Sequence, residues 1–322
     1  MIAGVDLAGW RELAGTVRRA SWEAQATISV SAAGPEITVR PMLLGPSRVA
    51  RPFTVAGDPV ALLLSALAAD TAATVAISLT RQGALPTKIN IRGYAGQAPK
   101  MGVHLDVAGL ITPTQLAAAA DHVRRYSVIL RTLAEPTPVR LLLVTPDGSQ
   151  PVHLAGPLPD SPSAGAGGAP LGSPLAGVGG VPGDSPSAHP AGPPLPDAAA
   201  EAHAVWQQGA RSTVTAADRA IVIDRPKQLF GTDRGPSPEE CLLAALAAET
   251  LARTGGEVHV SARQDLRGGL GFDGAPVGLR DILVQCLDPQ APIPAPGPVL
   301  ELLRQPTDVS IEIENRRTPD AP

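Results

Sequence analysis

The stretches ALLLSALAADT, residues 61–71, and ECLLAALAAET, residues 240–250, each predict a helix that is apolar on nearly every side. Both apolar runs end on a carboxylate followed by threonine, at Asp70 and at Glu249, which lie 179 positions apart (249 − 70). A helix that is apolar all round must be covered all round by other parts of the protein. The sequence therefore predicts two buried central helices, one in each half of the chain.

The two helices begin with the same signals. Asp58 and Ser237 are predicted N-cap residues, and each is followed by proline, which favours the first helical position. Glu240 stands three residues after Ser237 and completes a capping box. Because glycines mark the ends, we expect helices over about 59–82 and 238–254.

A second pair of stretches repeats at an offset of 170 residues (297 − 127). SVILRTLAEPTPVRLLLV begins at Ser127, and GPVLELLRQPTDVSIEIE begins at Gly297. In the first half a longer helix precedes this stretch, with Thr112 as its N-cap and Gln115 completing a capping box. In the second half that helix has shrunk to the proline-rich DPQAPIPAPG. The two repeats indicate that both halves share one fold.

Short alternating or β-branched segments fill the space between these landmarks. ATISVSAAGPEITVRP and RSTVTAADRAIVIDRP precede the central helices and predict β-hairpins. KINIRG, VHLDVAG, EVHVSARQ and RDILVQCL predict further strands. Each half is therefore predicted to contain a β-hairpin, a buried central helix, two strands, a second helix and a last strand, which is an α+β fold. We expect the halves to cover each other's helix.

Residues 146–198 are dominated by Pro, Gly, Ser and Ala. Such a segment cannot bury enough apolar surface to offset the entropy of ordering it. The sequence therefore predicts a flexible linker between an N-terminal half, residues 1–145, and a C-terminal half, residues 199–322, whose second helix is degenerate.

Composition excludes several classes of partner. The 322 residues carry a formal net charge of −4, and the basic residues are scattered, so nucleic acid is not expected to bind. The sequence has no run of about 18 apolar residues and no signal-peptide pattern, so we expect a soluble, cytoplasmic protein without membrane association. Its two cysteines lack CxxC spacing and its histidines lack ligand spacing, so we expect no metal and no cofactor.

GPSPEECLLAALAAET resembles the central-helix signature of the OsmC/Ohr family, thiol peroxidases that reduce organic hydroperoxides. In that signature a Gly-Pro-Ser/Thr-Pro start leads into a helix rich in Glu, Leu and Ala, and then to the peroxidatic cysteine followed by threonine. GDPVALLLSALAADT is similar to it, and SVILRTLAEPTPV and GPVLELLRQPTDV resemble the family's Cys-Pro-Val motif. The resemblance covers most of both halves. Because members are homodimers of intertwined protomers, it implies such a dimer fused into one chain, an intramolecular pseudo-dimer with an apolar cleft between its halves.

The chain departs from the family at the reactive positions. The family's first cysteine falls on Asp70 and on Glu249, and its second falls on Ser127 and on Gly297. The family reaction needs a thiolate to attack the peroxide and a second thiol to resolve the sulfenic acid. The resemblance therefore implies the fold and the cleft, and the departures argue against peroxidase activity.

Asp70 and Glu249 are instead the candidate catalytic residues. A carboxyl that is desolvated at the foot of a cleft has a raised pKa and can act as a general acid or base near neutral pH. The alternative for each is an ion pair. Glu249 has Arg253 one turn later on the same helical face. Asp70 has Thr74 at that position, so it has no cation on its own helix, and its candidate partners near the second motif are Arg124, Arg125 and Arg131.

Four further residues are candidates for binding a substrate. Tyr126 and Ser127 lie at the second motif, where core packing of the tyrosine and a plain helix serine are the alternatives. Phe53 and Phe230 precede the central helices and are candidates for the walls of the cleft.

Three functions stay open at this point. The first is an acid/base enzyme, of the isomerase, cyclase, dehydratase or hydrolase type, that acts on a small apolar organic molecule. The second is a non-catalytic ligand-binding pseudoenzyme, which an arginine within salt-bridge distance of Asp70 would favour. The third is a residual hydroperoxide reductase in the oxidative stress response that uses Cys241.

Overall fold

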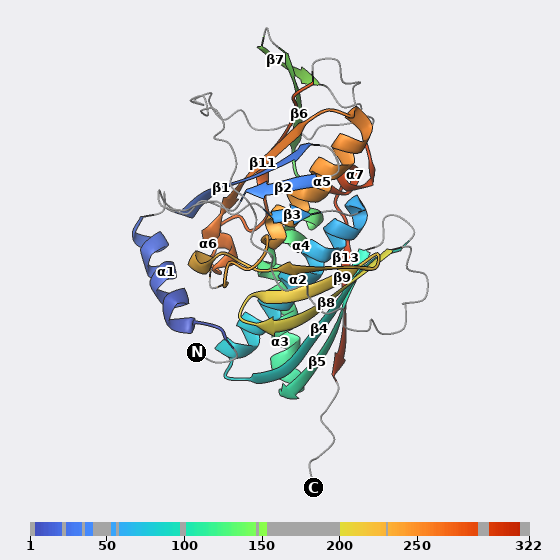
Figure 1. Cartoon of the computed structure of the whole chain (residues 1–322). Helices are drawn as coiled ribbons and strands as arrows, with labels where there is room; N and C mark the ends of the chain where they lie inside the picture. The colour runs from blue at the N-terminus through green and yellow to red at the C-terminus, as the bar shows by residue number, and fades with distance from the viewer. Residues whose placement is uncertain are drawn as a thin grey trace.

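The computed structural model describes residues 4–20, 24–33, 36–40, 53–55, 58–96, 101–145, 148–152, 200–229, 231–288 and 296–315. These residues form an α+β fold with two mixed sheets (Figure 1). The long helices α2 (Pro59–Arg81) and α5 (Pro238–Thr254) pack against each other between the sheets. One sheet covers α5 and the other covers α2, so both predicted central helices are buried.

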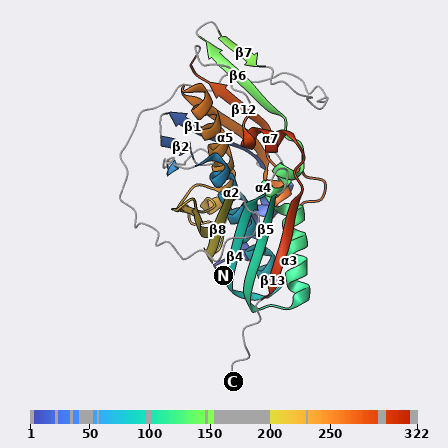
Figure 2. The same ribbon diagram turned by 90° about the vertical axis from the view of Figure 1, so that its right-hand side faces the viewer.

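The seven-stranded sheet has the order β3 (Phe53–Val55), β2 (Glu36–Arg40), β1 (Gln25–Ala33), β11 (Val258–Asp265), β12 (Arg280–Cys286), β6 (Val139–Thr145) and β7 (Gly148–Val152). The six-stranded sheet has the order β10 (Arg219–Ile223), β9 (Arg211–Ala216), β8 (Ala200–Gln208), β4 (Leu85–Ala95), β5 (Met101–Leu110) and β13 (Val309–Asn315). Each sheet contains one parallel pair, β12 with β6 and β5 with β13. Figure 2 shows β13 beside β5.

Both sheets follow one plan. In each, three strands that precede one central helix are joined to two strands that follow the other central helix. The next strand is again from the first of these two halves, β6 in one sheet and β13 in the other. Each half therefore contributes strands to both sheets, and the boundary between the halves in sequence does not separate two domains in space.

The remaining helices are α1 (Leu7–Arg19), α3 (Pro113–Tyr126), α4 (Val128–Ala134), α6 (Leu266–Gly269), α7 (Pro298–Arg304) and a 3-10 turn η2 (Lys227–Leu229). The predicted helix starts are confirmed. Asp58 accepts a hydrogen bond from the third residue of α2, and Thr112 and Ser237 form complete capping boxes. α5 ends at Gly255, whose φ of 71° is in the left-handed region that glycine adopts readily.

A reciprocal pair of hydrogen bonds joins the segments after α4 and α7. The amide of Thr137 donates to the carbonyl of Leu303, and the amide of Thr307 donates to the carbonyl of Leu133, both at 2.9 Å. The second sequence repeat aligns Thr137 with Thr307 and Leu133 with Leu303. The two hydrogen bonds therefore join pairs of residues that the repeat makes equivalent.

By length and composition, α2 is the one described helix that is long and apolar enough to cross a membrane. In the fold, 94% of its most apolar window is buried inside the protein. The apolar character of α2 is therefore explained by its central position, where α5 and the six-stranded sheet cover it.

Three strands, β3, β7 and β8, add to the predicted plan. β7 pairs with β6 and lies within the range predicted as linker, whose other residues, 146–147 and 153–198, are outside the described residues. β8 occupies the position beside β4 that β1 occupies beside β11. The hairpin predicted from RSTVTAADRAIVIDRP forms β9 and β10, which lie beside β8 as β2 and β3 lie beside β1. The hairpin predicted from ATISVSAAGPEITVRP forms β1 and β2, so the two hairpins do not occupy equivalent positions in their sheets. Of the degenerate second helix, residues 289–295 are outside the described residues.

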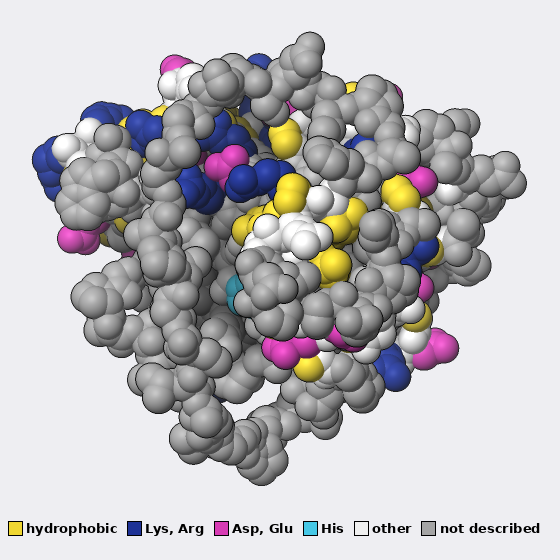
Figure 3. All heavy atoms as spheres, turned by 90° about the horizontal axis from the view of Figure 1, so that it is seen from above, with side chains coloured by type: hydrophobic (Ala, Val, Ile, Leu, Met, Phe, Trp, Pro, Cys, Tyr) yellow, Lys and Arg dark blue, Asp and Glu magenta, His cyan; other side chains and the backbone are white. Residues whose placement is uncertain are grey.

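Exposed arginines lie on neighbouring strands of the seven-stranded sheet. These are Arg140, Arg263 and Arg280, and Figure 3 shows Lys and Arg side chains grouped on one part of the face seen from above. Arg263 lies 3.9 Å from Asp281, and the two side chains are 69% and 59% exposed. An exposed pair of this kind contributes at most about 1 kcal/mol. The charges with larger energetic consequences are therefore those in the interior.

Candidate functional site

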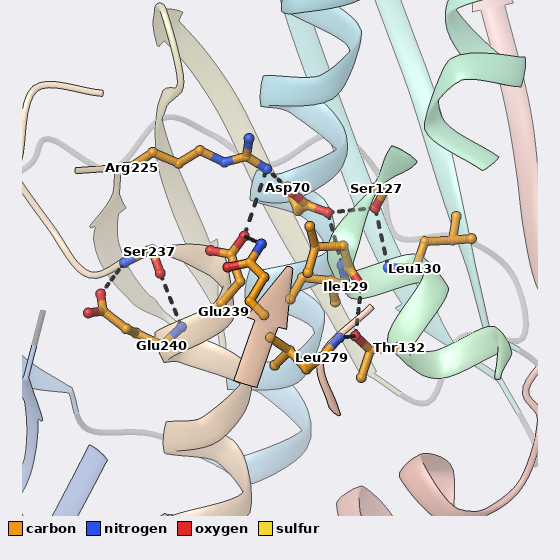
Figure 4. Close-up of polar contacts among 12 residues, drawn as sticks. Asp70, Ser127, Ile129, Leu130, Thr132, Arg225, Ser237, Glu239, Glu240 and Leu279 are labelled. Carbon is orange, nitrogen blue, oxygen red and sulfur yellow. Dashed lines mark hydrogen bonds and ion pairs between the residues drawn. The ribbon is translucent and has the colours of Figure 1, made fainter. Parts of the chain in front are cut away.

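Asp70, near the middle of α2, is fully buried and has three polar partners among the described residues. Its Oδ2 accepts hydrogen bonds from the hydroxyl of Ser127 at 2.6 Å and from the amide of Ile129 at 3.1 Å. Its Oδ1 lies 2.5 Å from Nη2 of Arg225. Figure 4 shows the carboxylate between Arg225 and the start of α4. Asp70 thus joins α2, α4 and the segment that follows β10.

Arg225 stands between two carboxylates. Its side chain is 12% exposed, and the same Nη2 lies 3.9 Å from Oε1 of Glu239, which is in the first turn of α5 and 1% exposed. The amide of Gln264 donates to that Oε1 at 3.5 Å. We call Asp70, Ser127, Arg225, Glu239 and Gln264 the Asp70 site. Asp70 and Ser127 come from the N-terminal half, and Arg225, Glu239 and Gln264 come from the C-terminal half.

Three buried polar atoms of the Asp70 site have no hydrogen-bond partner among the described residues. They are Nε of Arg225, Oε2 of Glu239 and Oε1 of Gln264. A buried donor or acceptor without a partner costs about 1–3 kcal/mol. Native proteins satisfy most of their buried polar groups, so a cluster of three such atoms marks a place where a function is to be sought.

The environment of the Asp70 site changes the pKa of two of its groups. Burial raises the pKa of Glu239, Arg225 lowers it in part, and Asp70 raises it further. Burial lowers the pKa of Arg225, but the neighbouring carboxylates more than compensate, so the pKa of Arg225 is raised and the guanidinium stays charged.

Glu249, at the repeat position of Asp70, is also buried. Its Oε2 accepts from the amide of Val299 at 2.7 Å, and its Oε1 accepts from the amide of Leu300 at 3.0 Å, both at the start of α7. Burial raises the pKa of Glu249, and these backbone hydrogen bonds lower it in part. A Cβ at Gly297 would lie 2.3 Å from Cδ of Glu249. The Glu249 carboxylate therefore fills the space of the missing side chain at residue 297.

Asp70 and Glu249 both accept hydrogen bonds from backbone amides at the start of a short helix, but the residues that complete the two caps differ. In the first half the hydroxyl of Ser127 accepts from the amide of Leu130 at 3.2 Å, while Asp70 takes the amide of Ile129. In the second half Glu249 is one methylene longer and takes both corresponding amides. Negative charge at the N-terminus of a helix is stabilising, so both acids have a structural role.

The predicted partners of the two acids were wrong. Arg124 pairs with Asp121 and Arg131 pairs with Glu135, and all four side chains are partly exposed. The partner of Asp70 is Arg225, 155 residues away in the chain, rather than Arg124, Arg125 or Arg131. For Glu249 the contacts are the two backbone amides, and the exposed Arg253 only contributes to lowering its pKa.

Of the four candidate substrate-binding residues, Ser127 lies in the Asp70 site. Tyr126 is half-buried at the end of α3, and its ring packs against that of His122 with centroids 4.6 Å apart. Phe53 belongs to β3, but its side chain is outside the described part of the structure, and Phe230 is outside it altogether.

Sequence reasoning missed Arg225, Glu239 and Gln264. A signal for Glu239 was available in the repeat, because the position 179 residues earlier is Val60. An acid in one half where the other half has an apolar residue indicates that the two positions have diverged. Asp70 therefore has a second buried carboxylate, that of Glu239, nearby. The repeat counterpart of Glu239 is Val60, so the other half has no acid at this position.

Both cysteines, Cys241 and Cys286, are buried, and neither forms a disulfide. Burial raises the pKa of Cys241 well above its ordinary value, and Glu240 and Glu239 add to this effect. Burial also raises the pKa of Cys286. Because the thiolate is the nucleophile, Cys241 is poorly suited to attack a peroxide.

Comparison of the chain with family models, with curated proteins and with solved structures finds no match in any of the three.

Proposed function

We propose that this chain is a small-molecule-binding protein built like a fused OsmC-type dimer, in which carboxylates stand at the positions of the reactive sulfurs and the peroxidase reaction is lost. The observation that carries this proposal is the saturation of Asp70, whose oxygens are taken up by Ser127, the amide of Ile129 and Arg225. These contacts hold the carboxylate of Asp70 against donors of the protein itself. This arrangement favours the ligand-binding alternative over catalysis by Asp70.

Two features support the fused-dimer part of the proposal. The sheets have the same strand order with the roles of the halves exchanged. The reciprocal hydrogen bonds of Thr137 and Thr307 join residues that the repeat makes equivalent. A chain that arose by duplication of an intertwined dimer would have both features.

The Asp70 site favours a ligand with a neutral hydroxyl group. Nε of Arg225 can donate a hydrogen bond, and the free oxygens of Glu239 and Gln264 can accept one. A hydroxyl both donates and accepts, whereas a carboxylate ligand would add a negative charge beside Asp70. Most of the buried side chains of α2 near Asp70 are Ala and Leu. We therefore propose that the ligand is a small, largely apolar molecule with one hydroxyl head group.

Binding without turnover tests this proposal. Cumyl alcohol and cumene hydroperoxide share an apolar body and a hydroxyl group, and we expect titration calorimetry to detect binding of both. Arg225→Met should weaken the binding of each by roughly tenfold or more, because a hydrogen bond to a charged group contributes about 1.5–3 kcal/mol. With a dithiol reductant present, the protein should not consume the hydroperoxide.

The controls separate the alternatives. Asp121→Asn, which alters an exposed ion pair on α3, should bind both compounds like the wild type. Hydroperoxide consumption that Cys241→Ser abolishes would instead establish the residual reductase. Absence of binding, or binding that Arg225→Met leaves unchanged, would refute a ligand site at Arg225.

Acid/base chemistry is the second candidate function, with Glu239 in place of Asp70 as the proton-transfer group. Two observations favour Glu239: its pKa is raised by burial, and its Oε2 has no hydrogen-bond partner among the described residues. A buried carboxyl that keeps its proton to higher pH than an ordinary carboxyl is better suited to act as a general acid.

The raised pKa of Glu239 predicts a pH dependence of stability. The unfolded chain releases this proton in the ordinary carboxyl range, while the folded protein retains it to higher pH, so the folded state binds more protons within that window. The unfolding free energy of the wild type relative to Glu239→Gln should therefore fall as pH rises through the window and then level off. Urea unfolding between about pH 4 and pH 9 measures this difference, and parallel profiles would exclude Glu239 as a titrating acid.

A further inference from the structure

The segment between β10 and α5 is closed by one buried carboxylate. Asp224 is fully buried, and its Oδ2 accepts from the amide of Thr232 at 2.9 Å, from the Thr232 hydroxyl at 2.6 Å and from the amide of Arg234 at 3.2 Å. The amide of Asp224 donates to the carbonyl of Pro236 at 3.0 Å. We call residues 224–229 and 231–236 the Asp224 loop.

The backbone of Arg225 is held inside the Asp224 loop. Its carbonyl accepts from the amide of Asp233 at 3.4 Å. A Cβ at Gly231 would lie 1.5 Å from the carbonyl oxygen of Arg225, and a Cβ at Gly235 would lie 1.9 Å from that of Val222. Because Gly231 and Gly235 have no Cβ, this part of the loop packs directly on the backbone of Arg225 and Val222.

The same loop also leads to Glu239. After Pro236 the chain continues to Ser237, the N-cap of α5, and Glu239 follows in the first turn. Figure 4 shows Arg225 extending from its segment to a point above Glu239 and beside Asp70. The loop therefore sets the spacing between the guanidinium and the second carboxylate.

We propose that Asp224 is the positioning residue of the Asp70 site: by closing the loop it holds the Arg225 guanidinium between Asp70 and Glu239. Asp224 itself contacts the loop and not the carboxylates, so it acts through Arg225. Its importance for binding rests on the proposed function. Its effect on the geometry of the site does not, and that effect can be measured without a ligand.

The titration of Glu239 reports the position of Arg225. The charged groups that face Glu239 are Arg225, which lowers its pKa, and Asp70, which raises it, with Glu240 next to it on α5 and the neutral Gln264 opposite. The readout is the carboxyl ¹³C resonance of Glu239 in full-length protein labelled at glutamate, assigned by its loss in Glu239→Gln. Arg225→Met should shift this titration to higher pH. Asp224→Asn should shift it in the same direction by a smaller amount, and should add nothing in the Arg225→Met background.

Asp218→Asn is the matched control, because Asp218 is exposed in the turn between β9 and β10 and the substitution removes the same charge. It should leave the Glu239 titration in place. If Asp224→Asn does not fold, Thr232→Val removes only the 2.6 Å hydroxyl bond to Asp224 and should give a smaller upward shift. A Glu239 titration that stays unmoved in whichever of these two variants folds would overturn the proposal and leave Asp224 a purely structural residue. The result is independent of whether cumyl alcohol binds.

Discussion

Asp70→Asn is expected to lower the unfolding free energy by about 3–5 kcal/mol at neutral pH, because it leaves the buried Arg225 without its counter-charge. Asparagine keeps one oxygen for the hydroxyl of Ser127 and the amide of Ile129, but its amide group then faces a guanidinium that can only donate. Urea unfolding followed by circular dichroism measures the loss, provided that the slope with denaturant is unchanged.

Two further variants show whether the loss comes from the pair. Arg225→Met should also destabilise the protein, and the double variant Asp70→Asn/Arg225→Met should lose less than the sum of the single losses, because both members of the Asp70–Arg225 pair are then neutral. Asp121→Asn, the same substitution in an exposed pair of the same half, should change stability by about 0.5 kcal/mol or less. A stability at or above wild type in Asp70→Asn would indicate a strained functional acid and would restore Asp70 as the candidate catalyst.

The ion pair between Asp70 and Arg225 also restricts how the two halves can pack around the Asp70 site. A buried ion pair contributes little net stability compared with apolar residues of the same volume, but it is costly to separate. Asp70 and Arg225 come from different halves, so any slip of α2 relative to the segment after β10 would break the pair. The pair therefore penalises alternative packings of the halves around the site, and Glu239 gains a fixed neighbour.

The features that local chemistry determines were predictable from the sequence. Asp58, Thr112 and Ser237 signal helix starts because an N-cap side chain bonds to amides two or three residues later, within the same short segment. The apolar character of α2 and α5 likewise predicts that they are buried, whatever covers them.

The features that the sequence did not predict depend on distant parts of the chain. Arg225 reaches Asp70 because β8 pairs with β4, and neither the pairing nor its register leaves a local signal. β8 itself begins with AEAHA, whose alanines give little hydrophobic contrast between the two faces of a strand. β3 has three residues, too few to show an alternation. Glu239 stands in the first turn of a helix, where acidic residues usually cap and face solvent.

The arrangement at Glu249 and Gly297 predicts a second large effect. Gly297→Ser should lower the unfolding free energy by about 2–3 kcal/mol, because the new side chain displaces a carboxylate that accepts two backbone hydrogen bonds. The backbone itself is not the obstacle: Gly297 has φ −106° and ψ 177°, which any residue adopts. Gly15→Ser on α1, where the nearest atom to a new Cβ is a flexible arginine end at 3.5 Å, is the tolerated control.

A second substitution should repair the first. Glu249→Asp shortens the acid by one methylene and, in the Gly297→Ser background, rebuilds the Asp70–Ser127 arrangement of the first half. We expect Glu249→Asp alone to destabilise, because the shorter side chain leaves an amide of α7 uncapped, by about 1 kcal/mol. The double variant should then be more stable than Gly297→Ser, with a coupling of about 1–3 kcal/mol in the double-mutant cycle. Additive losses would show that the two halves do not cap their short helices interchangeably, whereas a recovered stability would mean that Glu249 with Gly297 and Asp70 with Ser127 are two forms of one structural unit, and that only the neighbourhood of Arg225 and Glu239 distinguishes the first as a site.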